Sequence, residues 1–198
     1  MAGVVRLEVF RCPVLLLLFF LMASVSTVWF LRMRSPVGPL LLAAGKKGLR
    51  CLQFDRGELP RAARGEVWIE SRAALRPYSQ QLRAYFRGEL KQFTCKLDLQ
   101  GTTFQKACWE ALLGIPYGAT CSYAELARKV GRPRAFRAVG QANHRNPVAI
   151  IVPCHRVIGA GGSLTGYGGG LPIKEKLLRL EGASTQPALS FSDAVSPK

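Results

Sequence analysis

Residues 122–143, SYAELARKVGRPRAFRAVGQAN, determine the fold expected for the second half of the chain. A serine followed three residues later by Glu125 is a capping box, which predicts a helix over residues 123–130. The glycine-bearing turn 131–133 leads into a second helix over residues 134–143. Two short helices joined by such a turn are typical of a helix–turn–helix.

The second helix of this pair has the composition of a DNA-reading helix. Arg132, Arg134 and Arg137 supply positive charge for phosphates. Small side chains on one side would let the helix approach a surface closely: Ala135, Ala138, Gly140 and Ala142. The alternative is ordinary tight helix packing with solvated arginines.

The charge of the chain favours a polyanionic partner. Lysine and arginine number 28 against 12 acidic residues, a formal net charge of +16. Nucleic acid is the first candidate and an anionic membrane surface the second. A basic protein without such a partner is the alternative.

A cysteine with an activating neighbourhood follows in residues 150–158, IIVPCHRVI. Cys154 has His155 and Arg156 directly after it, and Pro153 stiffens the approach. A thiol reacts as its thiolate, which a neighbouring base or cation favours; the alternative is a buried, inert cysteine. A reactive cysteine shortly after a DNA-reading helix indicates chemistry on a base flipped out of the duplex.

The other cysteines predict neither a metal site nor disulfides. The chain has six cysteines and two histidines, without a C-x-x-C pair, so a zinc finger or ribbon lacks its ligand set. The irregular spacing predicts reduced, mostly inert thiols in an intracellular protein.

The first part of the chain reads as a small α/β unit. Apolar runs at residues 39–44 and 49–54 predict a hairpin around a four-residue loop. Helical spacing over residues 71–86 predicts a helix that begins at or near Pro77. Alternation over residues 93–99 predicts a strand.

Helices dominate after residue 100. Thr102 can cap a helix through Leu113, and Pro172 opens a last helix that ends near Glu181. We therefore expect an α/β domain over residues 33–100, a DNA-binding domain over residues 101–183, and a disordered tail over residues 184–198.

The N-terminal extension, residues 1–32, allows three interpretations. Residues 12–31 carry no charge and are long enough for a membrane anchor, or they belong to a cleaved signal. The third interpretation, which we favour, places the true start at Met33. A chain starting there is expected to be soluble and fully active, in the cytoplasm with the nucleoid or in the nucleus.

Taken together, the motifs resemble those of the O6-alkylguanine-DNA alkyltransferases, the methylated-DNA–protein-cysteine methyltransferases, of the bacterial single-function type. The match covers residues 33–182, in family order and spacing. The motifs are PCHRV (153–157), GTTFQ (101–105), IPYG (115–118), SY (122–123), RAVG (137–140), NP (146–147), GY (166–167), and the closing KE (174–175) and LEG (180–182).

The resemblance implies an alkyl transfer that uses no cofactor. Cys154 is the implied acceptor, and its thiolate takes the alkyl group from O6 of guanine, or more weakly from O4 of thymine, as an irreversible thioether. His155 is the implied base, reaching the thiol through a water, and Glu181 orients it. Neighbouring residues of an extended chain face opposite sides, so either the backbone bends at Cys154 or a water bridges the two groups.

The same resemblance implies roles in DNA binding. Arg137 fills the gap left by the flipped base, Tyr123 presses on a phosphate, and Arg134 adds positive charge. Asn146 holds the turn before the cysteine, while Tyr167, Tyr123 and Val157 line the alkyl pocket. The implied partner is double-stranded DNA, bound by a monomer through the minor groove.

The implied fold is α/β (α+β), with an N-terminal ribonuclease-H-like domain before a helical winged-helix-like domain. No zinc ligands like those of vertebrate members can be placed, so we expect no metal. Ala149 replaces a proline of some members, and Phe136 makes the recognition helix bulkier unless it faces the core. The rival hypotheses are a non-enzymatic binder of alkylated DNA, whose known examples lack the cysteine, and a cysteine hydrolase.

Overall fold

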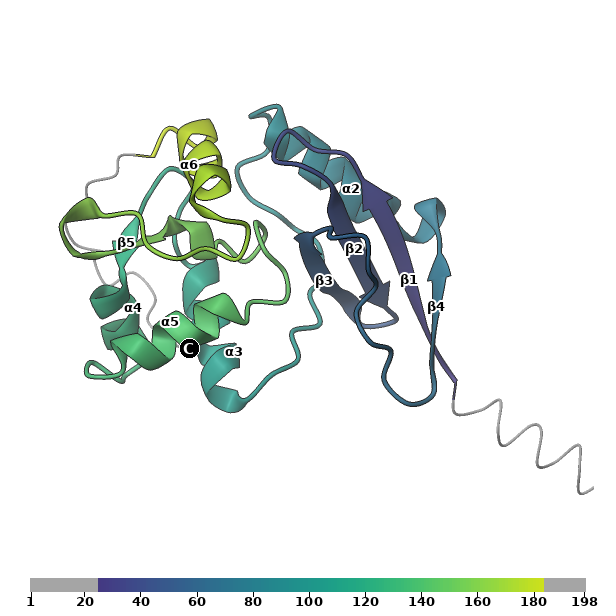
Figure 1. Cartoon of the computed structure of the whole chain (residues 1–198), viewed down its shortest axis with the longest axis horizontal. Coiled ribbons are helices and arrows are strands. Elements are labelled where there is room, and N and C mark those ends of the chain that lie inside the picture. Colours follow the sequence, from purple (N-terminus) through teal and green to yellow (C-terminus); the bar gives the residue numbers. More distant parts are fainter. Residues whose placement is uncertain (1–24, 184–198) are drawn as a thin grey trace, which may run out of the picture.

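The structure is a computed structural model that describes residues 25–183. Figure 1 shows two parts side by side, a sheet with one long helix and a group of shorter helices. Residues 87–102 connect them without a regular helix or strand. The expected division into an α/β part and a helical part is therefore present.

The first part is a four-stranded sheet in the order β3-β2-β1-β4. Its elements are β1 (Ser26–Met33), β2 (Leu40–Gly45), β3 (Gly48–Phe54), β4 (Glu66–Glu70) and α2 (Arg72–Phe86). Strand β1 runs antiparallel to β2 and parallel to β4. Strand β2 is buried along almost its whole length, which explains its unbroken apolar run.

The predicted hairpin is confirmed, with a tighter turn. Gly45 pairs with Gly48, so only Lys46 and Lys47 lie in the turn rather than four residues. Gly48 has φ +144°, and a Cβ there would lie 2.6 Å from the carbonyl oxygen of Lys96. Only glycine lets the connecting segment pass this close to β3.

The prediction that the helix begins near Pro77 is wrong, because α2 begins at Arg72. The side-chain oxygen of Ser71 accepts a hydrogen bond of 3.2 Å from the backbone nitrogen of Ala74. Leu75 in this first turn is fully buried in the core. A satisfied cap and a buried leucine favour the extra turn, so Pro77 lies inside the helix.

The strand predicted over residues 93–99 is also wrong. That segment makes only an isolated parallel bridge between Leu49 and Leu97. The backbone nitrogen of Leu49 donates to Lys96 and that of Asp98 donates to Leu49, at 2.9 and 2.8 Å. The apolar side chains that alternate along this segment do pack on the core. The segment has no neighbouring strand along its length.

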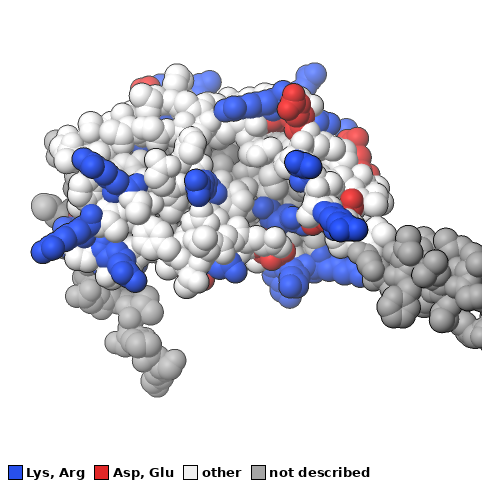
Figure 2. Space-filling model, turned by 60° about the horizontal axis from the view of Figure 1, so that its bottom comes forward, with Lys and Arg blue, Asp and Glu red and all other residues white. Residues whose placement is uncertain are grey.

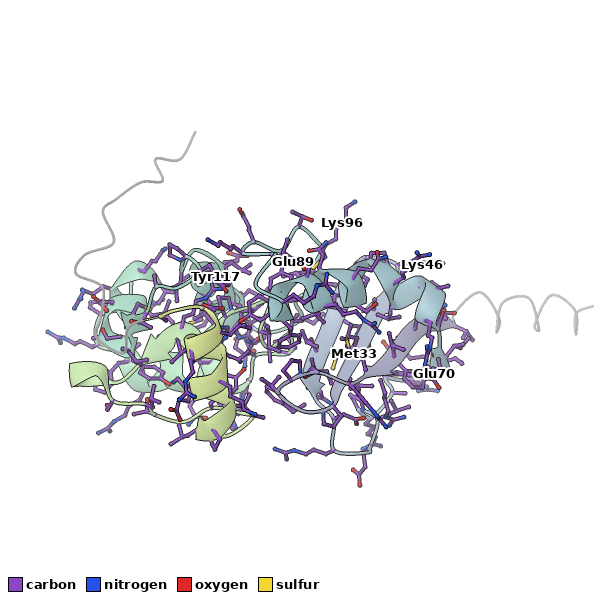
Figure 3. All side chains as sticks on the ribbon, turned by 90° about the horizontal axis from the view of Figure 1, so that it is seen from above. Met33, Lys46, Glu70, Glu89, Lys96 and Tyr117 are labelled. Atoms are coloured by element: carbon purple, nitrogen blue, oxygen red, sulfur yellow. The ribbon has the colours of Figure 1, made fainter. Side chains whose placement is uncertain are left out.

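The predicted domain start at Met33 is wrong, because it lies at the end of strand β1 and would leave the rest of that strand outside the domain. Met33, labelled in Figure 3, is the last residue of β1. Phe30 of the same strand pairs with Ala43 on one side and with Glu70 on the other. Strand β1 therefore lies inside the sheet, between β2 and β4, and its side chains Val28, Phe30 and Leu31 are buried.

The rest of the apolar N-terminal segment, residues 12–24, lies outside the described residues, as does the predicted tail 184–198. Within residues 25–183, no helix is long and apolar enough to cross a membrane.

The second part consists of short helices around two short strands. Its elements are α3 (Thr103–Leu113), β5 (Cys121–Ser122), α4 (Tyr123–Lys129), α5 (Phe136–His144), η1 (Cys154–Arg156), β6 (Val157–Ile158), η2 (Ala160–Gly162) and α6 (Leu171–Leu180). The predicted cap at Thr102 and the predicted capping box at Ser122 are both present, and the cap at Thr102 is also a capping box, with Gln105. Helix α5 starts two positions later than predicted, and Ala135 at its N-cap makes no side-chain hydrogen bond.

The two parts share one apolar core and are bonded through their backbones. The nitrogen of Leu52 in β3 donates to the carbonyl of Pro147 at 2.9 Å, and the nitrogen of Ala149 donates to the carbonyl of Leu52 at 2.8 Å. The N-terminal sheet therefore holds the chain directly where it approaches Cys154.

Candidate active site

The chain bends sharply before and at Cys154. Ile150 has φ +72°, a left-handed conformation that a β-branched residue rarely adopts. The nitrogen of Cys154 donates to the carbonyl of Val152 at 2.8 Å, and Cys154 then opens the short 3-10 helix η1. Of the two arrangements expected for Cys154 and His155, the bend is therefore present.

The side-chain amide of Asn146 stabilises this bend with three hydrogen bonds. Its Nδ2 donates to the carbonyl of Val152 at 2.8 Å and to the sulfur of Cys154 at 3.1 Å. Its Oδ1 accepts from the nitrogen of Val148 at 3.0 Å. One amide thus fixes both the turn and the sulfur.

A buried cluster of charged and polar groups lies behind the cysteine. The Nε2 of His155 is 2.9 Å from Oε1 of Glu181, and both side chains are fully buried. Arg156 donates to both carboxylate oxygens, from Nε at 2.8 Å and from Nη2 at 2.9 Å. This bidentate pair compensates the burial of the carboxylate charge.

The IPYG motif encloses this cluster. The carbonyl of Ile115 accepts a hydrogen bond from Nη1 of Arg156. The nitrogen of Gly118 donates to Oε2 of Glu181 at 3.3 Å, and a Cβ at Gly118 would lie 2.9 Å from the carbonyl oxygen of Glu181. The glycine, at φ +78°, is required for this close approach.

The electrostatics keep the histidine neutral and the carboxylate charged. Burial lowers the pKa of His155 below its usual value, although Glu181 opposes this shift. Burial alone would raise the pKa of Glu181, but hydrogen bonds from His155 and Arg156 outweigh it and lower the pKa to about 2. An ionised carboxylate only accepts hydrogen bonds, so Nε2 of His155 carries the proton and Nδ1 is the free base.

The Cys154 thiol is not pre-ionised. Burial raises its pKa, while the hydrogen bond from Asn146 and the charge of Lys174 lower it in part. Lys174 is itself fully buried, and its Nζ donates to the carbonyls of Val157 and Thr165 at 2.6 and 2.7 Å. Burial lowers the pKa of Lys174 to about 8.

Two of the three expected pocket residues lie beside the reacting groups. The ring of Tyr167 stands edge-on to that of His155, with centroids 6.5 Å apart, and edge-on to that of Phe54 in β3 at 5.8 Å. Tyr123 is partly buried at the start of α4 and lies close enough to Cys154 for the two groups to interact electrostatically. Val157 is fully buried in the core, where its carbonyl receives Lys174.

The helix–turn–helix presents a basic face. Arg132, Arg134 and Arg137 are all exposed. In Figure 2 basic side chains protrude over both halves of the molecule, and over the left half, which is the helical domain, few acidic side chains accompany them. This distribution suits a partner that carries phosphates.

The small residues of α5 divide into two sets. Ala142 is buried, and a Cβ at Gly140 would contact the ring of Tyr123 at 3.7 Å, so these two serve internal packing. Ala138 is exposed beside the arginines. Phe136 does not face the core: it is 49% exposed and borders a groove of about 650 Å³ that Tyr123 also lines.

The cluster contains groups that the motifs did not assign. Arg156 follows His155 in the motif, so its position was visible in the sequence although its carboxylate partner was not. Lys174 lay in a matched motif without a role. Tyr85, whose OH donates to Oε1 of Glu181 at 2.7 Å, gave no signal, because it is a core position of a helix in the other domain. Within residues 25–183, no group of three or more His, Cys, Asp or Glu side chains could hold a metal ion.

Fold and site together define a two-domain protein in which a helix–turn–helix domain carries a cysteine backed by a buried histidine–carboxylate pair. Two family models match it: "6-O-methylguanine DNA methyltransferase, ribonuclease-like domain" over residues 31–99, and the DNA binding domain of the same family over residues 103–183. The chain belongs to this family, which confirms the resemblance and the two-domain fold inferred from the motifs.

Individual relatives agree with this assignment. The methylated-DNA–protein-cysteine methyltransferase of Methanosarcina acetivorans is 55% identical over 153 residues, which are 75% of this chain and 95% of that protein. The protein of the same name from Mycobacterium leprae is 52% identical over 161 residues, 81% of this chain and 96% of the relative.

Solved structures give the same result. The O6-methylguanine methyltransferase of Mycobacterium tuberculosis has a TM-score of 0.72 at 50% identity, covering 81% of this chain and 96% of that one. The structure of M. tuberculosis OGT in complex with DNA has a TM-score of 0.71 at 49% identity, covering 82% and 96%.

Proposed function

We propose that this protein repairs O6-alkylguanine in double-stranded DNA by moving the alkyl group to the sulfur of Cys154. The observation that carries the proposal is the arrangement of a partly buried cysteine, an amide donor on its sulfur, and a buried neutral histidine held by a carboxylate. The exposed arginines of the helix–turn–helix in the same domain support DNA as the substrate.

The reaction begins with loss of the thiol proton. Because the pKa of Cys154 is raised, a base must remove this proton when substrate is bound. Nδ1 of His155 makes no hydrogen bond to a protein atom of the described residues, so it can take the proton through a bridging water. Glu181 and Arg156 hold the ring for this step.

In the transfer step the thiolate attacks the alkyl carbon. The carbon–sulfur bond forms as the bond from that carbon to O6 breaks, and the guanine leaves with the electron pair and takes up a proton. A thioether has no easy leaving route, so each molecule acts once and needs no cofactor. The same geometry serves O4-alkylthymine, more weakly.

DNA is bound by the exposed side of α5 and the residues before it. Arg137 enters the duplex where the damaged nucleotide has been flipped out, Arg134 contacts phosphate, and Tyr123 presses on the phosphate beside the target. Tyr123 and Tyr167 flank the alkyl group. One molecule carries every proposed group, so we expect a monomer to act, and to act where chromosomal DNA is.

The test mixes the protein with a duplex that carries labelled O6-methylguanine. Label is expected on the protein, at Cys154 by mass spectrometry. Cys154→Ala should abolish transfer, while Cys95→Ala, which removes another partly exposed thiol, should leave it intact. Absence of label on the wild-type protein would overturn the proposal and favour a non-enzymatic lesion binder. Transfer that survives Cys154→Ala would overturn it by excluding Cys154 as the acceptor.

A further inference from the structure

Tyr85 reaches the acceptor site from the other domain. It lies in α2 of the N-terminal domain, is fully buried, and donates from its hydroxyl to Oε1 of Glu181 at 2.7 Å. That oxygen also accepts from Nε2 of His155 and Nη2 of Arg156, each at 2.9 Å. The phenol therefore shares an acceptor with the proposed base.

Packing alone does not account for a tyrosine here. The ring of Tyr85 lies among the rings of Phe86, Phe93 and Tyr117, with centroids 5.3 to 6.2 Å apart. Phenylalanine would fill such a place equally well, and burying a hydroxyl costs free energy unless it is hydrogen-bonded. The hydroxyl is thus explained by the carboxylate that it contacts.

The carboxylate is held from several sides, and Tyr85 supplies the contact from the N-terminal domain. Arg156 and the backbone of Gly118 hold Oε2, while Tyr85, His155 and Arg156 share Oε1. Burial raises the pKa of Tyr85 far above its usual value, so the phenol stays a donor. It fixes Glu181 and draws electron density from the oxygen that faces His155.

We propose that Tyr85 is a positioning residue for alkyl transfer, by which the N-terminal domain sets the orientation and basicity of His155 through Glu181. This inference rests on the proposed function of the site. Removing only the hydroxyl should leave Oε1 more available to His155, favour the imidazolium and raise the pKa of His155. The neutral ring is the base. As the pH is lowered, the rate of transfer should therefore begin to fall at a higher pH in the variant than in the wild type.

Titratable and charged side chains from several elements surround Glu181 and His155. Glu181 meets Tyr85 from α2 and Arg156 from η1, and Tyr117 lies close to it. His155 also has Lys174 of α6 and Tyr167 nearby. Tyr85→Phe changes one of these groups and leaves the others in place.

The experiment measures the single-turnover rate of label transfer against pH at saturating protein. For Tyr85→Phe we expect the acid limb to move up by about half a pH unit, and the maximal rate to fall about threefold to tenfold. Affinity for lesion-free duplex should be unchanged, because the side chain is fully buried and belongs to α2, outside the helix–turn–helix.

The matched control is Tyr117→Phe. Its hydroxyl, on the labelled side chain in Figure 3, donates to the carbonyl of Leu180 at 3.0 Å and not to the carboxylate. It loses a comparable hydrogen bond and should keep the wild-type acid limb. If Tyr85→Phe keeps both the wild-type limb and rate, or if Tyr117→Phe shifts equally, the proposal is overturned. Failure of the wild type to accept label would instead overturn the proposed function.

Discussion

At the level of single residues, the surroundings of Cys154 shift the pKa of its thiol in opposite directions. Burial raises the pKa of the thiol, while the amide of Asn146 and the ammonium of Lys174 favour the thiolate. The thiol therefore stays protonated until a base removes its proton. Such balance suits an acceptor that is consumed in one reaction, because a fully ionised thiol would be spent on other electrophiles.

Asn146→Ala tests this balance. The variant removes the donor to the sulfur, so the pKa of Cys154 should rise and the rate of iodoacetamide labelling at neutral pH should fall about tenfold. The lost bonds to Val148 and Val152 should also lower the free energy of unfolding by about 1–3 kcal/mol.

The control for that measurement is Asn143→Ala, which removes a buried amide that makes no hydrogen bond to a protein atom of the described residues. It should leave the labelling rate of Cys154 near the wild-type value. Equal rates in the wild type and Asn146→Ala would show that the amide does not act on the sulfur.

At the level of elements, α5 combines a packing side and an exposed side. Val139 and Ala142 face the core, whereas Phe136 and Arg137 at its start are exposed. The guanidinium of Arg137 lies 6.0 Å from the centre of the Phe136 ring, a cation–π contact. The bulky side chain that the sequence left ambiguous therefore belongs to the face that we expect to meet DNA.

Phe136→Ala should weaken duplex binding by up to about tenfold, because aromatic contacts to nucleic acid are lost. The salt dependence of binding should not change, since no charge is removed, whereas Arg137→Ala should reduce it. Fluorescence anisotropy over a salt series gives both quantities.

The control for α5 is Leu113→Ala, which removes an exposed apolar side chain from α3. The three substitutions are at exposed side chains, so the free energy of unfolding of Phe136→Ala, Arg137→Ala and Leu113→Ala should stay within about 0.5 kcal/mol of the wild-type value. Wild-type affinity in Phe136→Ala would exclude the ring from the DNA contact.

For the whole molecule, the sheet and the helical domain form a joint structure around the site. The N-terminal domain bonds the segment before Cys154 through Leu52, supports Tyr167 through Phe54, and contacts Glu181 through Tyr85. At Gly169 a Cβ would lie 2.5 Å from the Phe54 ring, so the glycine-rich loop is fitted to the sheet. Loss of the sheet should therefore disturb the site as well as the fold.

A chain starting at Met33 should fail to fold, contrary to the expectation from the sequence. It lacks Val28, Phe30 and Leu31, which are buried in β1. Each such side chain contributes about 1.5–3 kcal/mol, and the total approaches the usual stability of a domain. A chain starting at Val25 is the control; gel filtration and circular dichroism compare the two, and a folded, active Met33 chain would contradict the role of β1.

Acid should destabilise the whole molecule through the buried cluster. The pKa of Glu181 falls from 4.5 to about 2 on folding, so its stabilisation is present above pH 4.5 and is lost as the pH falls toward 2. The difference corresponds to about 3 kcal/mol. The lowered pKa of His155 adds a further loss of stability, which begins as the pH falls below the ordinary value of 6.5. In that range the histidine of the unfolded chain takes up a proton while the buried histidine of the folded protein does not.

Urea unfolding across this pH range measures the effect, with Glu181→Gln as the comparison. The variant should be less stable at neutral pH and show a flatter acid slope. Parallel pH profiles in the two proteins would locate the acid sensitivity elsewhere.

The sequence by itself determined the chemistry and most helix positions. Cys154, His155 and Arg156 are contiguous, and the caps at Thr102 and Ser122 act within one turn, so these features depend on local contacts. The family and its two domains followed from the same motifs, and the matching family models confirm them.

Only the tertiary structure decided what surrounds those motifs. The contact of Tyr85 with Glu181 joins residues of two domains, and the place of Ser26–Met33 inside the sheet depends on partners on both sides. Residues 93–99 alternate like a strand yet lack a partner along their length. Contacts of this kind depend on how distant segments pack, and the pattern of a segment alone does not specify its neighbours.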